Sequence, residues 1–528
     1  MARRWALALV ALTVAASLTP DGTAAPNEPT LSFLQVEPAA TAGGLPRIVD
    51  ELHREVLLRG VNVNGLEDYY QDSPHPLDVV YPTTRAAYSH GRCPRASTAI
   101  QTAPLCEFDA TQIRRYGYNV VRLALSWSLL EPQSGQISAA YLDRITQVVG
   151  WFRDQHIRVV LDIHQDAWSK YIYTPKGTTC PPGFSTIGGY HEADGAPEWA
   201  SRTKLPACAF QGIREIDAAV AERFNALYAN LPAPDGVGLR DHYAAVLAAM
   251  AKRFVADPTV AGYDLMNEPQ PGFTPVVTGA VLVFQFQAAL VDAMRAAAPG
   301  FRQLVFLEPD AIRNVTDLGG HVLPWSAFNS YPNAVYAPHV YTGVFTYDAI
   351  VGGILGTPRF VKAHDSYTKA RRDAVLLGLP LWVGEFGTSI SADSTLLTDH
   401  YTEQDANGIG GVLWVWKQYR RGDFSVMHEP FGQGTAYPSR VVVTDRVYPQ
   451  ATNGRIVRLS YVPTTGRFHL SVTGAHENGA ATALHIPSRI TAPLLLTAAR
   501  AETTREPSGA RRVLIFPTAP DYVVDLAN

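Results

Sequence analysis

Short apolar runs alternate with longer amphipathic segments over most of the chain. The runs are rich in branched and aromatic residues and lie at 55–63, 119–127, 158–166, 260–268, 303–309, 334–341, 379–387 and 410–418. Helix-like segments between them include 139–155, 241–256, 278–298, 361–378 and 394–407. Strands that are apolar along their whole length are typical of parallel sheets covered on both faces. The pattern therefore predicts an α/β fold, a (β/α)8 TIM barrel. A doubly wound open sheet is the alternative, but no glycine-rich phosphate-binding turn follows the first run.

Beyond Val447 the apolar runs become shorter, and no long helical segment separates them. These runs lie at 455–462, 467–474, 482–488, 493–499, 511–517 and 521–526. Short alternating runs joined by turns are typical of antiparallel sheets. We therefore expect a barrel domain over 26–447 and a C-terminal antiparallel β-sandwich domain over 448–528. A short hairpin within 31–59 is expected to close the bottom of the barrel.

The first 25 residues have the pattern of a secretory signal peptide. Arg3 and Arg4 precede an apolar run over 5–18, and small residues follow as far as Ala25. The run is too short to span a bilayer comfortably, so a signal peptide over 1–25 is favoured over an anchor. The sequence therefore predicts a secreted, extracellular protein.

Export makes disulfide bonds possible, and the chain has four cysteines in two close pairs. We expect local pairing of Cys93 with Cys106 and of Cys180 with Cys208, among three possible connectivities. A zinc site is the alternative, but no two cysteines have the C-x-x-C spacing.

Composition and charge limit the classes of partner. The chain has 528 residues, 47% of them hydrophobic, and a formal net charge of −4. That length is sufficient for two domains, and the charge gives no electrostatic basis for binding nucleic acid. Nothing in the sequence implies a metal ion or an organic cofactor, and nothing indicates an oligomeric state.

Polar and aromatic residues stand at or just after the ends of most predicted strands. They are Asn62, Asn64, Arg122, His164, Asp166, Asn267, Glu268, His339, Tyr341, Glu385 and Trp416. In a TIM barrel the carboxyl ends of all strands point to one face, where active sites lie. We therefore expect residues that are hundreds of positions apart to converge there.

Two of these residues are glutamates, at the ends of the fourth and seventh runs. Paired carboxylates on either side of a glycosidic bond are what its hydrolysis requires, and a separation of about 5–5.5 Å leads to retention of configuration. Glu268 is interpreted as the general acid/base, with Asn267 binding a sugar 2-hydroxyl. Glu385 is interpreted as the nucleophile, because Arg122 and Tyr341 can hydrogen-bond its carboxylate and keep its pKa low.

The remaining polar residues receive supporting roles. His164 and His339 are expected to bind sugar hydroxyls or to tune the two carboxylates. Trp416 offers a flat face for a sugar ring, although Trp414 lies in the same alternating phase and the sequence does not decide between them. Glu308 follows the fifth run and is interpreted as a substrate contact or a structural residue. A metal site at His164, Asp166 and His339 is disfavoured, because no compact ligand cluster accompanies them.

The motifs VVRLALSW, DIHQD, DLMNEP, APHVY, VGEFG and WVWK, in this order, resemble those of glycoside hydrolase family 5. That family has a (β/α)8 barrel and a retaining mechanism, in which the glutamate of the NEP motif is the acid/base and the later glutamate the nucleophile. Within it, RLALSWSLLEP, YLDRI, GAPEWAS, YAPHVY and VTDRVYPQATNG are similar to the endoglycoceramidase (endoglycosylceramidase) group. The resemblance runs from about Leu58 to the C-terminus.

The resemblance to endoglycoceramidases implies a glycosphingolipid substrate that is cut between the glycan and ceramide. His164 and Asp166 match positions that contact the sugar next to the cut in that group. The expected partner is a glycolipid or another β-glycoside, and transient contact with a membrane surface is compatible with such a substrate. A binding protein on an inactive barrel is disfavoured, because both glutamates are present.

One loop departs from the endoglycoceramidase pattern. The loop after the first strand reads NVNGLEDYYQ, with Glu67 and Asp68 and without the lysine that reaches the sugar in that group. The alternative is therefore a β-glucosidase or glucanase of the same family that acts on oligosaccharide, steryl or flavonoid glucosides. Aromatic residues crowd the insert after the third strand, either to hold an aglycone or as a self-packing surface loop. They are Trp168, Tyr171, Tyr173, Phe184, Tyr190 and Trp199.

Overall fold

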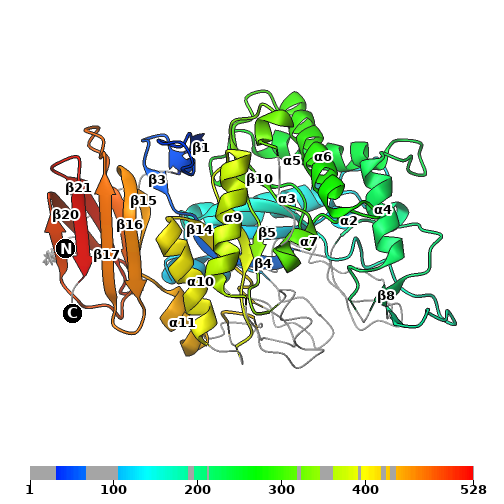
Figure 1. Cartoon of the computed structure of the whole chain (residues 1–528). Helices are drawn as coiled ribbons and strands as arrows, with labels where there is room; N and C mark the ends of the chain where they lie inside the picture. Colours follow the sequence, from blue (N-terminus) through cyan, green and yellow to red (C-terminus); the bar gives the residue numbers. More distant parts are fainter. Residues whose placement is uncertain are drawn as a thin grey trace, which may run out of the picture. The chain divides into compact units, whose positions relative to one another are not determined.

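The computed structural model describes most of the barrel and the C-terminal region (Figure 1). The described residues are 31–66, 105–187, 195–210, 213–317, 323–344, 361–390, 394–417, 424–427 and 436–526. The predicted signal peptide at 1–25, the loop residues Glu67 and Asp68, the cysteine Cys93 and the aromatic residue Tyr190 lie outside them.

A closed ring of parallel strands confirms the predicted TIM barrel. Its strands are β4 (Arg59–Leu66), β5 (Val120–Ser126), β6 (Arg158–His164), β9 (Val260–Asp264), β10 (Leu304–Leu307), β11 (Ala334–Tyr336), β12 (His339–Val340), β13 (Trp382–Phe386) and β14 (Gly410–Leu413). β11 and β12 are two halves of one strand, interrupted at Pro338, which has no backbone N–H for the ladder. Strand β14 pairs with β4, and Tyr336 pairs with Leu381, which closes the ring.

Helices cover the outside of the barrel close to the predicted positions. They are α1 (Glu107–Arg115), α3 (Ala139–Asp154), α4 (Ala218–Tyr228), α5 (Leu239–Phe254), α6 (Val276–Ala297), α9 (Ala363–Leu377) and α10 (Ser394–Asn407), with shorter α2 (Trp127–Leu130), α7 (Ala311–Thr316) and α11 (Pro438–Thr444). The Asp217 carboxylate accepts backbone N–H bonds that begin α4, and Gly378 at φ 73° ends α9. α6 is apolar and long enough to span a membrane, but Val283, Phe284 and Leu290 on it are fully buried in the barrel core.

The insert after β6 is a small disulfide-linked hairpin that the sequence pattern did not predict as strands. It contains β7 (Phe184–Thr186) and β8 (Cys208–Phe210) and a 3-10 turn, Glu198–Ala200. The predicted disulfide between Cys180 and Cys208 is confirmed, with Cα atoms 5.7 Å apart. Trp168 and Trp199 pack edge-on against Trp127. These inner aromatic residues therefore follow the self-packing interpretation.

Two antiparallel sheets confirm the predicted C-terminal β-sandwich. One has the order β16 (Arg455–Val462), β17 (Arg467–Thr473), β22 (Tyr522–Leu526) and β19 (Leu494–Thr497). The other has the order β1 (Leu34–Glu37), β2 (Arg47–Asp50), β3 (Glu55–Val56), β15 (Tyr448–Thr452), β18 (Thr482–Ile486), β21 (Arg511–Pro517) and β20 (Ala499–Arg505). Leu459, Phe468 and Val513 belong to the buried core that the two sheets share.

The predicted N-terminal hairpin is present as β1 and β2 and closes the bottom of the barrel. Leu34 and Ile48 on it are buried in one cluster with Val120 and Val160, which lie near the starts of β5 and β6. The same hairpin also joins the sheet of the C-terminal strands through β3 and β15, which the sequence did not predict. The hairpin that covers the bottom of the barrel is therefore part of a sheet of the sandwich.

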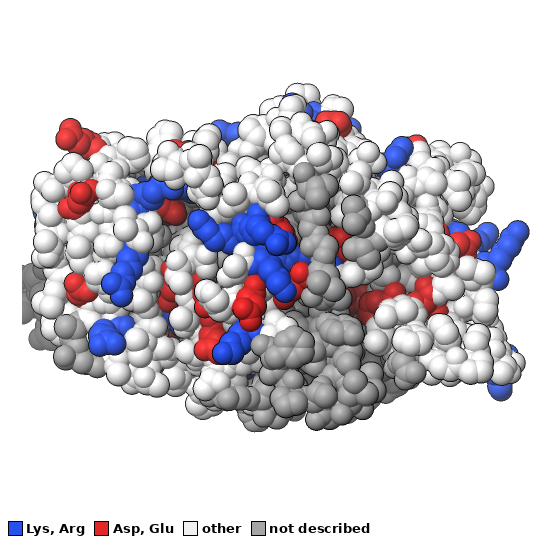
Figure 2. Space-filling model, viewed as in Figure 1, with Lys and Arg blue, Asp and Glu red and all other residues white. Residues whose placement is uncertain are grey.

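Charged side chains of both signs are mixed on the face seen in Figure 2. Lys and Arg side chains gather over α9, which carries Lys369, Arg371 and Arg372, and acidic side chains lie beside them.

Candidate active site

The predicted polar residues converge at the carboxyl ends of the barrel strands. His164 is the last residue of β6, Glu268 follows β9, His339 begins β12, and Glu385 lies in β13. Strand pairing places His339 directly beside Glu385. Residues that are more than a hundred positions apart therefore form one site, as expected for this fold.

Arg122 lies at the centre of the site and has no exposed surface. Its guanidinium donates to Glu385 Oε1 at 2.8 Å, to Asn62 Oδ1 at 3.1 Å and to Asn267 Oδ1 at 2.9 Å. Burial alone would lower its pKa, but the surrounding carboxylates, led by Asp162 and Asp264, raise that pKa well above its ordinary value. The prediction that Arg122 binds substrate is wrong, because all of its surface is used to hold protein side chains.

Both hydrogen bonds predicted for Glu385 are present. Tyr341 donates its hydroxyl to Glu385 Oε2 at 2.7 Å, and Arg122 donates to the other oxygen. The prediction of a low pKa for Glu385 is wrong for the ligand-free protein. Burial raises the pKa of this carboxyl more than the nearby His339 and Arg122 lower it. The geometry of a nucleophile is present, and its carboxyl has a raised pKa.

Glu268 is the more accessible of the two glutamates. Its side chain is 24% exposed, against 7% for Glu385. Its Oε1 lies 2.7 Å from His339 Nδ1, and its backbone N–H donates to Glu308 Oε2 at 3.0 Å. Burial would raise the pKa of Glu268, but the hydrogen bond and charge of His339 lower it overall. In the ligand-free protein Glu385 therefore has the higher pKa and Glu268 the lower. Catalysis requires the opposite order, because the acid must hold a proton and the nucleophile must be ionised.

His339 links the two glutamates and is completely buried. Its Nδ1 lies 2.7 Å from Glu268 Oε1 and 3.7 Å from Glu385 Oε2, and its Nε2 lies 3.1 Å from Glu308. Burial alone would lower its pKa, but Glu308, Glu385 and the bond to Glu268 raise it well above the ordinary value. Of the two roles predicted for His339, the structure supports tuning of carboxylates and gives the ring no surface for a sugar.

The other predicted residues surround this pair. His164 Nδ1 lies 2.7 Å from Asp162, and Asp166 is partly exposed. The Asn267 amide is buried and donates to the backbone carbonyl of Gln165 at 2.9 Å. Its bond to a sugar 2-hydroxyl stays a prediction.

The predicted aromatic platform is at a different residue. Trp416 is only 1% exposed, and its indole N–H donates to Asp109 at 2.9 Å, so the prediction for Trp416 is wrong. Trp414 is partly exposed and stacks on His164, with ring centroids 5.3 Å apart. Trp414, rather than Trp416, therefore lies beside the site with a partly exposed ring.

Sequence reasoning missed several buried residues that hold the site. The Gln165 side chain donates to the backbone carbonyls of Asn267 and Glu268, at 2.7 and 3.1 Å. Its carbonyl oxygen accepts from the backbone N–H of Trp168. Asp162 and Asp264 lie inside strands and face Arg122. Glu308, which the sequence left as a substrate contact or a structural residue, is fully buried against Arg122 and follows the structural interpretation. The only sequence signal for these residues was a polar side chain within an apolar run.

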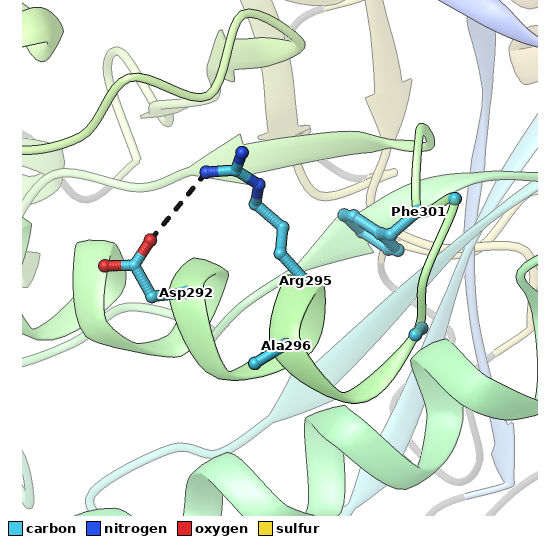
Figure 3. A pocket seen from close by; sticks show the side chains of 6 residues that line it. Asp292, Arg295, Ala296 and Phe301 are labelled. Carbon is cyan, nitrogen blue, oxygen red and sulfur yellow. Dashed lines mark ion pairs between the residues drawn. The ribbon is translucent and has the colours of Figure 1, made fainter.

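The hollow in Figure 3 lies away from these residues. It has a volume of about 460 Å³ and lies at the end of α6 and in the loop before β10. Its lining residues are Asp292, Arg295, Ala296, Ala298, Gly300 and Phe301. Because this loop leads into the amino end of a strand, the hollow is at the end of the barrel opposite to Glu268. Among the described residues, no group of three or more His, Cys, Asp or Glu is arranged to hold a metal ion.

Comparisons with known proteins agree with this geometry. Residues 106–420 match the cellulase family, glycosyl hydrolase family 5, and residues 446–508 match the glycoside hydrolase family 5 C-terminal domain. Endoglycoceramidase I of Rhodococcus hoagii is 29% identical over 384 residues, 68% of each chain. The crystal structure of an endogalactoceramidase is 29% identical, with a TM-score of 0.75, and covers 94% of this chain and 100% of that one.

A further solved structure shares the fold. Endo-glycoceramidase II from Rhodococcus sp., in complex with ganglioside GM3, has a TM-score of 0.68 at 23% identity, over 92% of this chain and 100% of that one. The family match covers more than half of the chain and includes both glutamates. The chain therefore belongs to glycoside hydrolase family 5 and is a glycoside hydrolase.

Proposed function

We propose that the protein is a secreted, retaining β-glycosidase that hydrolyses the bond between the glycan and ceramide of glycosphingolipids. The observation that carries this proposal is the pair Glu268 and Glu385, held by one shared histidine at the carboxyl ends of β9 and β13. The relatives named endoglycoceramidase and endogalactoceramidase support the choice of substrate. The signal-like sequence at 1–25 supports secretion.

The spacing of the two carboxylates favours a double displacement. Their facing oxygens cannot be further apart than the sum of their distances to His339 Nδ1, 2.7 and 3.7 Å. The proximity of these two oxygens is compatible with the roughly 5–5.5 Å separation of the carboxyl groups in retaining enzymes, in which the nucleophile attacks the anomeric carbon directly. Glu385 has that role in the proposed mechanism.

In the proposed reaction, Glu385 forms a bond to the anomeric carbon while the bond from that carbon to the leaving oxygen breaks. Glu268 gives its proton to the leaving oxygen, which departs as the hydroxyl of the aglycone. Glu268 then takes a proton from water, and the resulting attack at the anomeric carbon releases Glu385. Two inversions restore the original configuration.

The pKa order of the free protein must change for this reaction, and bound substrate supplies a cause. A sugar placed over Glu268 would remove its remaining contact with water, which raises a carboxyl pKa. Positive charge that develops at the anomeric carbon would favour the ionised form of Glu385. His339 Nδ1 lies within hydrogen-bond distance of Glu268 Oε1, at 2.7 Å. A proton transfer along this bond would convert Glu268 to its acid form.

The test is product analysis with purified protein and glucosylceramide, lactosylceramide and a ganglioside, with the Glu385→Gln variant as control. Release of an intact oligosaccharide and ceramide is expected from the larger substrates. Release of glucose alone, or cleavage of simple aryl β-glucosides without any action on lipids, would favour the β-glucosidase alternative. Recovery of the protein only inside the producing cells, with 1–25 uncleaved, would contradict secretion.

A further inference from the structure

Exposed aromatic side chains are concentrated in one part of the described structure. Among the described residues, the exposed aromatic side chains are Tyr173, Phe184, Phe210 and Phe273. The first three lie in the insert after β6, and Phe273 is 59% exposed five positions after Glu268. Leu205 and Ile216 add exposed aliphatic side chains to the insert. Clustered exposed apolar groups on a soluble protein mark an interaction site more often than isolated ones do.

The centre of this surface is the β7–β8 hairpin. Phe184 and Phe210 are directly opposite in the strand register, with ring centroids 5.3 Å apart, and they are 39% and 40% exposed. The disulfide between Cys180 and Cys208 crosslinks the same hairpin. The two rings are therefore held outward on a crosslinked support, which reduces the entropy lost when they enter an apolar phase.

The insert that carries the hairpin contacts the backbone of His164 and Asp166. Arg214 donates to the backbone carbonyl of Asp166 at 3.3 Å, and the Gly195 N–H donates to the His164 carbonyl at 3.2 Å. Gly195 has φ +86°, and a Cβ there would lie 2.3 Å from the Trp168 carbonyl oxygen, so only glycine fits this contact. A surface that binds the hairpin would therefore lie close to His164 and Asp166.

Cations accompany the apolar side chains. Lys176, Arg202 and Lys204 are exposed in this insert, and none of the ion pairs between described residues involves them. Glu198 and Glu215 are the exposed carboxylates of the same described stretch. Aromatic side chains beside lysine and arginine are the composition of protein surfaces that lie at a membrane–water interface.

We propose that the β7–β8 hairpin, with Phe184 and Phe210 at its centre, docks on the surface of a lipid bilayer and holds the active site against it. This proposal rests on the proposed function, because it explains how a glycan is reached while its lipid stays in a membrane. The phenyl rings enter the interface, and Lys176, Arg202 and Lys204 contact phosphate and carboxylate headgroups.

The test uses the full-length protein and sedimentation with vesicles that contain no glycolipid, so binding is measured without turnover. One set of vesicles is phosphatidylcholine, and a second set also contains phosphatidylserine. The test variant is Phe184→Thr with Phe210→Thr, because threonine suits strand positions. The matched control is Val457→Thr with Leu495→Thr, two exposed strand residues of the sandwich.

The phenylalanine variant is expected to lower vesicle partitioning by about tenfold or more, since each fully buried phenyl side chain contributes at least that factor. The sandwich control should bind like the unmodified protein. Lys176→Gln with Lys204→Gln should weaken binding to the phosphatidylserine vesicles alone, by about fivefold per lysine. All these variants should retain kcat/KM on a soluble aryl β-glycoside within about twofold.

Three results would overturn the docking proposal. They are unchanged vesicle binding by the phenylalanine variant, equal loss in the sandwich control, and a dimer in solution that the phenylalanine variant dissociates. The last would assign the surface to a second copy of the chain. Vesicle binding that depends on Phe184 and Phe210, together with no hydrolysis of any glycolipid, would leave docking intact and reject the proposed substrate.

Discussion

At the scale of single residues, one buried histidine affects the pKa values of both candidate catalytic glutamates. His339 is fully buried and lies between Glu268, Glu308 and Glu385. Its charge lowers the pKa of Glu268 and opposes the rise that burial causes in Glu385. A neutral residue at this position would remove both effects at once.

Substitution of the two glutamates should separate their roles. Glu268→Gln is expected to lower kcat on a glycolipid by about 10²–10⁴-fold, because general acid catalysis is lost. An aryl β-glycoside with a good leaving group needs little protonation, so its first step should survive and added azide should speed turnover. Glu385→Gln should lose activity on both substrates, because no nucleophile remains.

Steady-state kinetics with and without azide is the measurement, and thermal unfolding of each variant is the control for folding. Azide rescue of Glu385→Gln with retention of configuration would contradict the assignment, as would near-normal activity of either variant.

The raised pKa of His339 predicts a pH-dependent contribution to stability. A histidine has an unfolded pKa of about 6.5, and the folded value here lies well above it. The contribution is therefore complete below about pH 6.5 and is lost as the pH rises through the folded value. The free-energy advantage of the unmodified protein over His339→Asn should be largest near pH 6 and shrink toward pH 9. Urea unfolding across this range is the measurement, and an advantage that grows with pH would refute the prediction.

At the scale of elements, two loops hold each other in uncommon backbone conformations. Glu268 has φ 39° directly before Pro269, and Ala167 and Trp168 have φ 53° and 74°. Non-glycine residues rarely adopt this region, and such conformations persist where surrounding contacts enforce them. One loop follows β6 and the other follows β9. Hydrogen bonds of the Gln165 side-chain amide link the two loops.

Replacing Gln165 should therefore affect turnover more than stability. Gln165→Leu keeps the volume but removes bonds to the backbone of both loops, and we expect kcat to fall by about tenfold or more. The matched control is Gln303→Leu. Gln303 is also buried, directly precedes β10, and donates to the backbone carbonyl of Phe254 at the end of α5. Each variant should lose about 1–3 kcal/mol of unfolding free energy. Equal loss of kcat in both would mean that Gln165 acts through stability alone.

The sequence was sufficient for features that depend on local pattern. Runs apolar on both faces identified the barrel strands, and the strand ends identified Glu268, Glu385 and the hydrogen bonds from Arg122 and Tyr341. Trp414 and Trp416 could not be distinguished, because β14 ends at Leu413 and alternation no longer determines direction beyond it. The pKa order also could not be predicted, because it depends on burial and on three carboxylates that contact His339 from different strands.

At the scale of the whole molecule, strand pairing joins the two parts of the chain across the predicted boundary. Strand β3 pairs with β15, and Arg54 donates to the carbonyl of Ala481 at 2.9 Å. The Glu55 carboxylate accepts the Ile456 N–H, and its burial raises its pKa. The two parts share a sheet whose members come from both ends of the described chain.

A chain that ends at residue 447 should therefore fail to give a stable barrel. It would expose the edge of β3 and the apolar side chains that pack against the sandwich, such as Leu57. We expect insoluble protein on expression, whereas a chain that lacks only 1–25 should be soluble and active. Soluble fraction and aryl β-glycosidase activity are the measurements. A soluble, fully active 26–447 fragment would show that the sandwich is a separable module.

The shared sheet also determines when folding is completed during synthesis. The Arg54 and Ala481 partners are 427 positions apart, so the N-terminal hairpin has no partner strand until nearly all of the chain has been made. At typical rates of about 5–20 residues per second, this delay is on the order of tens of seconds. During that time the lower end of the barrel lacks its final cover, and contacts of such long sequence separation form slowly. The nascent chain is therefore expected to depend on chaperones until its last strands emerge.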